Sequence, residues 1–114
     1  MSRDIVNDIC RSLPGADWSD PWGGGHDAWK VGGKMFACIG SMGGGVSVKT
    51  PSIADAQLLI DMQRAARAPY FHRSWVQVDW NAIPPEELRD RIETSYRIVL
   101  SNLTKKAQRA ITGP

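Results

Sequence analysis

The chain has 114 residues, 42% of them hydrophobic and 23% charged, and its formal net charge at pH 7 is +2. This length suits one ordinary domain, so we expect a single domain over residues 1–114. No apolar run approaches the roughly 18 residues that a membrane-spanning helix requires. The opening residues, MSRDIVNDIC, carry acids where a signal peptide carries bases, so we expect a cytoplasmic protein.

The first predicted element is a short amphipathic helix that starts after a Ser2 cap and stops at Pro14-Gly15. Residues 16–27, ADWSDPWGGGHD, are polar and rich in glycine, which predicts a loop. Its two tryptophans, Trp18 and Trp22, either form a lid or partner surface or fold back on the core. We favour packing on the core.

Three strands follow, at 28–31, 34–39 and 46–49. Gly32-Gly33 is the pair expected in a two-residue hairpin turn, because both central positions of such a turn take positive φ. In that register Val31 faces Lys34. Trp29 then faces Phe36, so we expect an aromatic pair on one face of the sheet.

Residues 50–67 predict a second helix, with Ser52 as its cap, Asp55 three residues on, and a buried stripe of Leu58, Leu59 and Met62. A connection over 68–73 leads to a strand, SWVQVDW. One last helix starts at Pro84-Pro85 and runs through the basic residues Lys105, Lys106 and Arg109 near its end. Its buried stripe comprises Leu88, Ile92, Tyr96, Val99 and Leu103.

The element order is therefore α-β-β-β-α-β-α. Strands that are linked by hairpins favour an antiparallel sheet, and three helices suffice to cover one side of it. The sequence predicts an α+β fold of this kind rather than a doubly wound α/β fold.

The sequence departs from the motifs of nucleotide-binding proteins, serine hydrolases and metal sites at particular residues. A phosphate-binding loop ending at Gly33-Lys34 would need glycine where Ala28 stands, and serine or threonine where Met35 stands. Ser41 is not in a nucleophile elbow, since Ile39 replaces the first glycine of that motif. His26 and His72 lack the spacing of a metal site. We therefore expect turns at the glycines, no catalytic residue, no metal and no cofactor.

Two cysteines, Cys10 and Cys38, are too few and too far apart for a zinc ribbon or a disulfide framework, so we expect buried free thiols. One basic–aromatic set is a candidate site for nucleic acid or another anion. Basic side chains beside aromatic rings can contact phosphates while the rings stack on bases. The alternative is a solvated face with scattered charge. The set comprises Lys34 and Lys49 at strand ends, with Arg64, Arg67 and Arg73 flanking the junction before Trp75.

Five segments together resemble the MmcQ/YjbR family of small bacterial proteins over residues 10–106. They are SLPGA, KVGGKMFA, VSVK, W-V-x-V-D at 75–79, and EELRDRIETSYRIVLSNLTKK at 86–106. The resemblance implies a CyaY-like fold, related to frataxin, and a DNA-binding protein of the double-wing type. It implies no catalytic residues. The positions that match the family's pattern are Pro14, Gly15, Lys34, Phe36, Lys49, Trp75, Asp79, Ser95 and Tyr96. The connection at 68–74 is shorter than in the family.

We therefore expect a non-enzymatic protein that binds an anionic partner, with DNA as the first candidate. The rival interpretation is a small-ligand or protein-interaction module in which the tryptophan loop, 18–25, closes over a sheet face. A frataxin-like iron role is suggested by fold alone, and it would require more acids on the first helix than Asp4 and Asp8.

Overall fold

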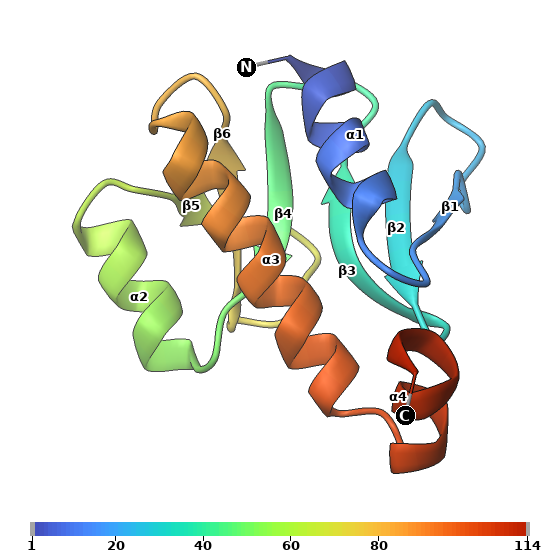
Figure 1. The fold of residues 1–114 in the computed structure, drawn as a ribbon. Helices are drawn as coiled ribbons and strands as arrows, with labels where there is room; N and C mark the ends of the chain where they lie inside the picture. The colour runs from blue at the N-terminus through green and yellow to red at the C-terminus, as the bar shows by residue number, and fades with distance from the viewer. Residues whose placement is uncertain (1, 114) are drawn as a thin grey trace.

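The computed structural model describes residues 2–113, which form helices and one six-stranded sheet (Figure 1). The elements in chain order are α1 (Arg3–Ser12), β1 (Asp17–Ser19), β2 (Asp27–Val31), β3 (Lys34–Ile39), β4 (Gly45–Lys49), α2 (Ile53–Asp61), β5 (Ala66–Arg67), β6 (Trp75–Asp79), α3 (Pro85–Ser101) and α4 (Lys105–Thr112).

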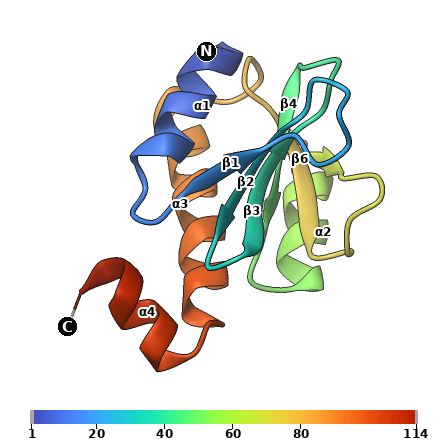
Figure 2. The same cartoon turned by 90° about the vertical axis from the view of Figure 1, so that its right-hand side faces the viewer.

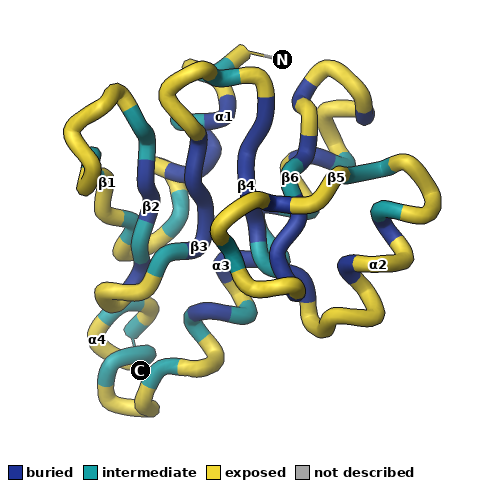
Figure 3. The backbone as a smooth tube through the Cα atoms, turned by 180° about the vertical axis from the view of Figure 1, so that it is seen from behind, coloured by how far each residue is buried: buried dark blue, intermediate teal, exposed yellow. Residues whose placement is uncertain are grey.

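The sheet has the order β1-β2-β3-β4-β6-β5, and every neighbouring pair is antiparallel. Helices α1 and α3 pack on one face, and α2 lies beside α3 near the β5–β6 edge (Figures 1 and 2). We call this the covered face and the opposite side the open face. Two loops, at residues 20–26 and 68–74, lie on the open side (Figures 2 and 3). The predicted α+β class with an antiparallel sheet is confirmed.

Both predicted helix caps are present. The Ser2 hydroxyl accepts a hydrogen bond from the Ile5 amide at 3.3 Å, and the Ser52 hydroxyl accepts one from the Asp55 amide at 3.0 Å. Such caps satisfy amides of the first helical turn that otherwise lack a partner inside the helix. The two caps could be predicted because each depends only on residues within one helical turn, and both predictions are confirmed.

The hairpin between β2 and β3 turns at Gly32 and Gly33, whose φ angles are +57° and +80°. Val31 pairs with Lys34 as predicted, but a bulge shifts the register so that Trp29 pairs with Ala37. The predicted pairing of Trp29 with Phe36 is therefore wrong. Phe36 is the extra residue of the bulge, and its ring packs edge-on against Tyr96 of α3, 5.3 Å between centroids.

Helix α2 is shorter than predicted. It ends at Asp61, Gln63 takes a positive φ of +58°, and the chain then forms the two-residue strand β5, which had been assigned to the helix. The predicted buried stripe is also partly wrong, because Leu58 and Met62 are more than half exposed. Ala56 and Leu59 are the buried residues of α2, since a short helix at the edge of the sheet buries only a narrow side.

The last predicted helix is two helices. Helix α3 ends at Ser101, and the Thr104 hydroxyl caps α4 by accepting the Ala107 amide at 3.1 Å. The turn between them places Leu103 over the β2–β3 hairpin, where a Cβ at Gly32 would lie 2.4 Å from the Leu103 Cδ1. The apolar stripe therefore continues through a turn rather than along one helix.

The core lies between the sheet and α1, α2 and α3. Trp29, Trp75 and Trp80 are buried as predicted, and Cys10 and Cys38 are buried free thiols. Trp18 and Trp22 are 55% and 59% exposed, so the expectation that they pack on the core is wrong. Strand β1, missed in the sequence, carries Trp18 at the outer edge of the sheet. Among residues 2–113, no helix is long and apolar enough to cross a membrane.

Candidate functional site: the open face of the sheet

Three of the six predicted site residues come together at one end of the sheet. Lys34 begins β3, Lys49 ends β4 and Trp75 begins β6, and all three line a cavity of about 500 Å³. Lys49 and Trp75 are direct cross-strand partners. We call this the lysine cavity. Phe71 and Met35 also line it, together with residues from the end of α3.

Trp75 forms a wall of the lysine cavity rather than a free platform. It is only 8% exposed, and its ring stacks on Phe71 with centroids 4.7 Å apart and planes 22° from parallel. Phe71 is half-buried and stands above it in the connection between β5 and β6. Phe71 could not be selected from the sequence, because a connecting segment has no periodicity that would show which of its side chains turns back onto the sheet.

Arg64 lines a separate cavity of about 410 Å³, which Lys49 also lines, and it has a partner. Its guanidinium donates to both carboxylate oxygens of Glu87 at the start of α3, with Nε 3.1 Å from Oε2. This ion pair lowers the pKa of Glu87 and raises that of Arg64. Arg64 therefore ties the segment after α2 to α3. Its guanidinium is already engaged by a carboxylate, which makes it a poor phosphate ligand.

Arg67 and Arg73 are exposed and line neither the lysine cavity nor the open-face cavity described below. Arg67 is on the edge strand β5 and pairs with Val76. Arg73 lies two residues before Trp75. Within residues 2–113 neither arginine forms an ion pair, so both are available to an anion that extends beyond the lysine cavity.

Ser95 of α3 fixes the position of the Lys49 backbone. The pairing of β3 with β4 ends at Ala37 and Val48, and the fully buried Ser95 hydroxyl links the two strands beside that pair. It donates to the Phe36 carbonyl at 2.6 Å and accepts from the Lys49 amide at 2.8 Å. Beside it, the Tyr96 hydroxyl donates to the Pro14 carbonyl at 2.5 Å, and burial raises the pKa of this tyrosine. Both family-matching residues of α3 thus have structural roles.

A second, larger hollow of about 610 Å³ lies on the open face, and we call it the open-face cavity. Its floor is formed by the strand residues Met35, Cys38, Ser47 and Gln77. Its walls come from the two loops that project on this side and from the turn after β3. Met35 and Phe71 line both cavities, so the two adjoin. The wall residues are Trp22, His26, Gly40, Pro69, Tyr70 and Phe71.

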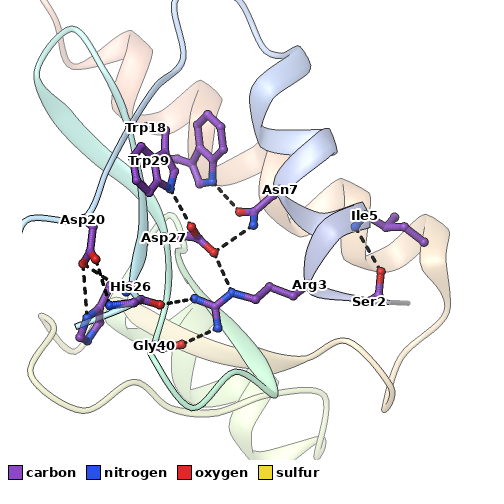
Figure 4. Close-up of polar contacts among 11 residues, drawn as sticks. Ser2, Arg3, Ile5, Asn7, Trp18, Asp20, His26, Asp27, Trp29 and Gly40 are labelled. Atoms are coloured by element: carbon purple, nitrogen blue, oxygen red, sulfur yellow. Dashed lines mark hydrogen bonds and ion pairs between the residues drawn. The ribbon is translucent and has the colours of Figure 1, made fainter. Parts of the chain in front are cut away.

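The loop that carries Trp22 is held by a polar network at its base (Figure 4). The Asp20 carboxylate accepts the amides of Gly25 and His26 at 2.9 and 3.1 Å, and the Gly25 hydrogen bond is the main cause of the lowered pKa of Asp20. From α1, the Arg3 guanidinium donates to the carbonyls of Gly25 and Gly40 at 2.7 and 2.9 Å. The wall is therefore positioned before any ligand binds.

Asp27 is the centre of the same network. Its carboxylate accepts hydrogen bonds from Arg3 Nε at 2.7 Å, Asn7 Nδ2 at 2.9 Å and Trp18 Nε1 at 2.7 Å (Figure 4). Burial opposes ionisation of Asp27, but these three donors outweigh it and lower the pKa of the group. Asn7 also accepts from Trp29 Nε1 at 2.9 Å. Asp20 and Asp27 thus both have structural roles.

Comparison with known proteins agrees with the resemblance seen in the sequence. The YjbR family profile matches residues 11–98. The chain belongs to the YjbR family. The YjbR match spans all six strands, α2 and most of α3, so the strand and loop residues of both cavities lie within it. No curated protein matches this sequence at a significant level.

The fold of this YjbR chain is shared with a solved protein. The crystal structure of Deinococcus radiodurans protein DR2400, whose domain is described as DUF419, superimposes with a TM-score of 0.81 at 22% sequence identity. The alignment covers 96% of this chain and 86% of that chain. At this identity the likeness shows only that the fold is shared. The function of the open face has to be inferred from the residues of this chain.

Proposed function

We propose that this YjbR chain is a non-enzymatic, cytoplasmic protein that binds DNA in single-stranded form at the lysine cavity. One observation carries the proposal: Lys34 and Lys49 line the same cavity as the Phe71–Trp75 stack. Lysine side chains attract phosphate, and a partly exposed aromatic ring stacks on an unpaired base. The family resemblance adds the DNA-binding label and a CyaY-like fold, both of which stay expectations.

The geometry favours a single strand over a duplex. Bases in a duplex are already stacked on both faces, whereas the bases of a single strand can stack on aromatic side chains. The Phe71 ring lies inside a cavity between a loop and the sheet, which an unpaired base can enter. Two lysines, with Arg73 beyond them, correspond to two or three phosphates. We therefore expect modest affinity and a log K against log salt slope of about −1.5 to −2.

The test is fluorescence anisotropy of labelled single-stranded and duplex DNA at several salt concentrations. The informative variant is K34E/K49E, which reverses both cavity lysines. Its matched control is K105E/K106E, which makes the same charge change on the exposed surface of α4. We expect the cavity variant to lose most single-strand binding and the α4 variant to keep most of it, with both melting near the wild-type temperature.

Two results would contradict the proposal. One is no binding of either DNA form at tens of micromolar protein in low salt. The other is an equal loss in the two variants, since that would show a response to net charge rather than to the lysine cavity.

A second candidate function is a small-ligand or protein-interaction module built on the tryptophan loop and the sheet face. The observation in its favour is the open-face cavity, whose volume of about 610 Å³ falls within the range typical of small-molecule sites. This function would not require Lys34 or Lys49. A change in tryptophan fluorescence with a small anion, and none with DNA, would favour it over the first.

A further inference from the structure

The floor of the open-face cavity contains the side-chain amide of Gln77, which has no hydrogen-bond partner among residues 2–113. Gln77 lies in the middle of β6 on the open side. A glutamine amide offers one acceptor oxygen and two N–H donors side by side. Its direct partner on β4 is Ser47, and its diagonal neighbour there is Gly45, where a Cβ would lie 3.2 Å from Gln77 Cγ and 3.3 Å from Nε2. The missing side chain at Gly45 therefore leaves room for the amide.

Aromatic side chains stand on both walls above this amide. On one wall Trp22 is 59% exposed and contacts His26 edge to face, with ring centroids 5.0 Å apart. On the other wall are Phe71, stacked on Trp75, and Tyr70, whose side chain is fully exposed. Tyr70 takes a φ of +70°, a left-handed conformation that non-glycine residues rarely adopt. All four ring systems, those of Trp22, His26, Tyr70 and Phe71, line the same cavity.

We propose that the open-face cavity binds one planar heteroaromatic ring of the nucleobase class, with Gln77 pairing to its edge and the aromatic walls holding its faces. Aromatic walls select a flat ring. A side-chain amide pairs with a ring edge that presents a donor next to an acceptor, as glutamine does with adenine. Adenine combines both features, so adenosine is the probe with which to test the site.

This inference deepens the proposed function and in part rests on it. The two cavities share Phe71 and Met35, so a strand whose phosphates lie near Lys34 and Lys49 could place one base against Gln77. The same chemistry would accept a free nucleoside. Binding of a DNA strand would require Lys34 and Lys49, whereas binding of a free nucleoside would not.

The experiment is calorimetric titration of adenosine into the wild type and two glutamine variants. Q77M keeps the length of the side chain and removes the amide, and Q57M makes the same change on the exposed surface of α2. We expect sub-millimolar binding to the wild type, a loss of about ten-fold in Q77M, and no change in Q57M. W22A should lose about five-fold or more. N6,N6-dimethyladenosine, which stacks but lacks the donor, should bind to the wild type about as weakly as adenosine binds to Q77M.

The proposal is overturned if adenosine fails to bind the wild type at millimolar concentration, or if Q77M binds it as well as Q57M does. The K34E/K49E variant separates this outcome from failure of the proposed function. If the wild type binds adenosine but no strand, or if K34E/K49E binds the strand as well as the wild type does, the proposed function alone is contradicted. If single-stranded DNA binds in a way that depends on Lys34 and Lys49 but adenosine does not bind, only the proposal of a nucleobase site is contradicted.

Discussion

The two faces of one sheet differ in what covers them. On the covered face, Val46, Val48, Val76 and Val78 are at most 1% exposed, and helices pack on them. On the open face, Cys38, Ser47 and Gln77 line a cavity together with exposed aromatic rings from two loops. The backbone of these loops is largely exposed (Figure 3). The covered face accounts for stability, because its contacts are apolar and closely packed. The open face offers polar groups and rings to a ligand, and we expect it to contribute much less to stability.

The largest difference in stability between the two faces is expected at two consecutive residues of β3. Phe36 is fully buried on the covered side, and Met35 is half-buried on the open side. We expect F36A to lose about 3–5 kcal/mol of unfolding free energy and M35A less than about 1 kcal/mol, measured by urea denaturation. Similar losses in the two variants would mean that the open face is part of the core.

The next largest effect is expected at the bulge. In S95A the buried Phe36 carbonyl loses its donor and the Lys49 amide loses its acceptor. Leaving two buried backbone groups unsatisfied should cost about 2–3 kcal/mol. Ser101 is the matched control on the same helix, since it is exposed and its hydroxyl bonds only to Ile98 within the helix. S101A should change stability by less than about 0.5 kcal/mol. If S95A were equally mild, the serine would not be what joins the two strands.

A smaller effect should follow from the network beneath the tryptophan loop. Because hydrogen bonds lower the folded-state pKa of Asp27, its contribution is complete above the ordinary pKa of an aspartate. It is lost as the pH falls through the lower folded value, below about pH 4. D27N removes the carboxylate and should cost about 1–2 kcal/mol at neutral pH. Its unfolding free energy should then fall less steeply with acid than that of the wild type.

The control for Asp27 is D8N, because Asp8 is 70% exposed and pairs only with Arg11 on the same helix. We expect D8N to follow the acid dependence of the wild type. A D27N profile that is indistinguishable from the D8N profile would show that the network adds nothing to stability.

The smallest effect on stability is expected at Tyr70. Glycine adopts the observed φ of +70° without strain, but it also makes the unfolded chain more flexible. We therefore expect Y70G to change the unfolding free energy by less than about 1 kcal/mol in either direction. Adenosine affinity should fall several-fold, because one ring of the wall is lost. A large loss of stability would show that the ring packs on the protein, contrary to its full exposure.

The covered face could be predicted from the sequence because its signals are local and periodic. The Ser2 and Ser52 caps, the Gly32-Gly33 turn and the stripe on α3 each specify one element, and each is present. The bulge at Phe36 could not be predicted, since no local pattern marks it and the donor to the Phe36 carbonyl, Ser95, is 59 residues away along the chain. The same holds for the two-residue strand β5, whose only support is its pairing with β6.

The candidate site was only partly predictable. Lys34, Lys49 and Trp75 could be chosen because they stand at strand ends beside aromatic residues. Arg64 looked equally suitable in the sequence, and only the fold shows that Glu87 engages it. The sequence pointed to Trp22 only as part of the tryptophan loop in the rival interpretation, and it did not point to Tyr70, Phe71 or Gln77. The first three lie in loops without periodicity, and Gln77 looked like an ordinary solvent-facing position of an alternating strand.

The most direct test of the central claim, that ligands bind at the open face and the adjoining end of the sheet, is NMR chemical-shift mapping with a short single-stranded oligonucleotide. The tryptophan indole signals report both faces at once. We predict shifts at the indoles of Trp22 and Trp75, on the open side, and none at those of Trp29 and Trp80, on the covered side. Shifts confined to α4, or spread evenly over both pairs of tryptophans, would contradict the account.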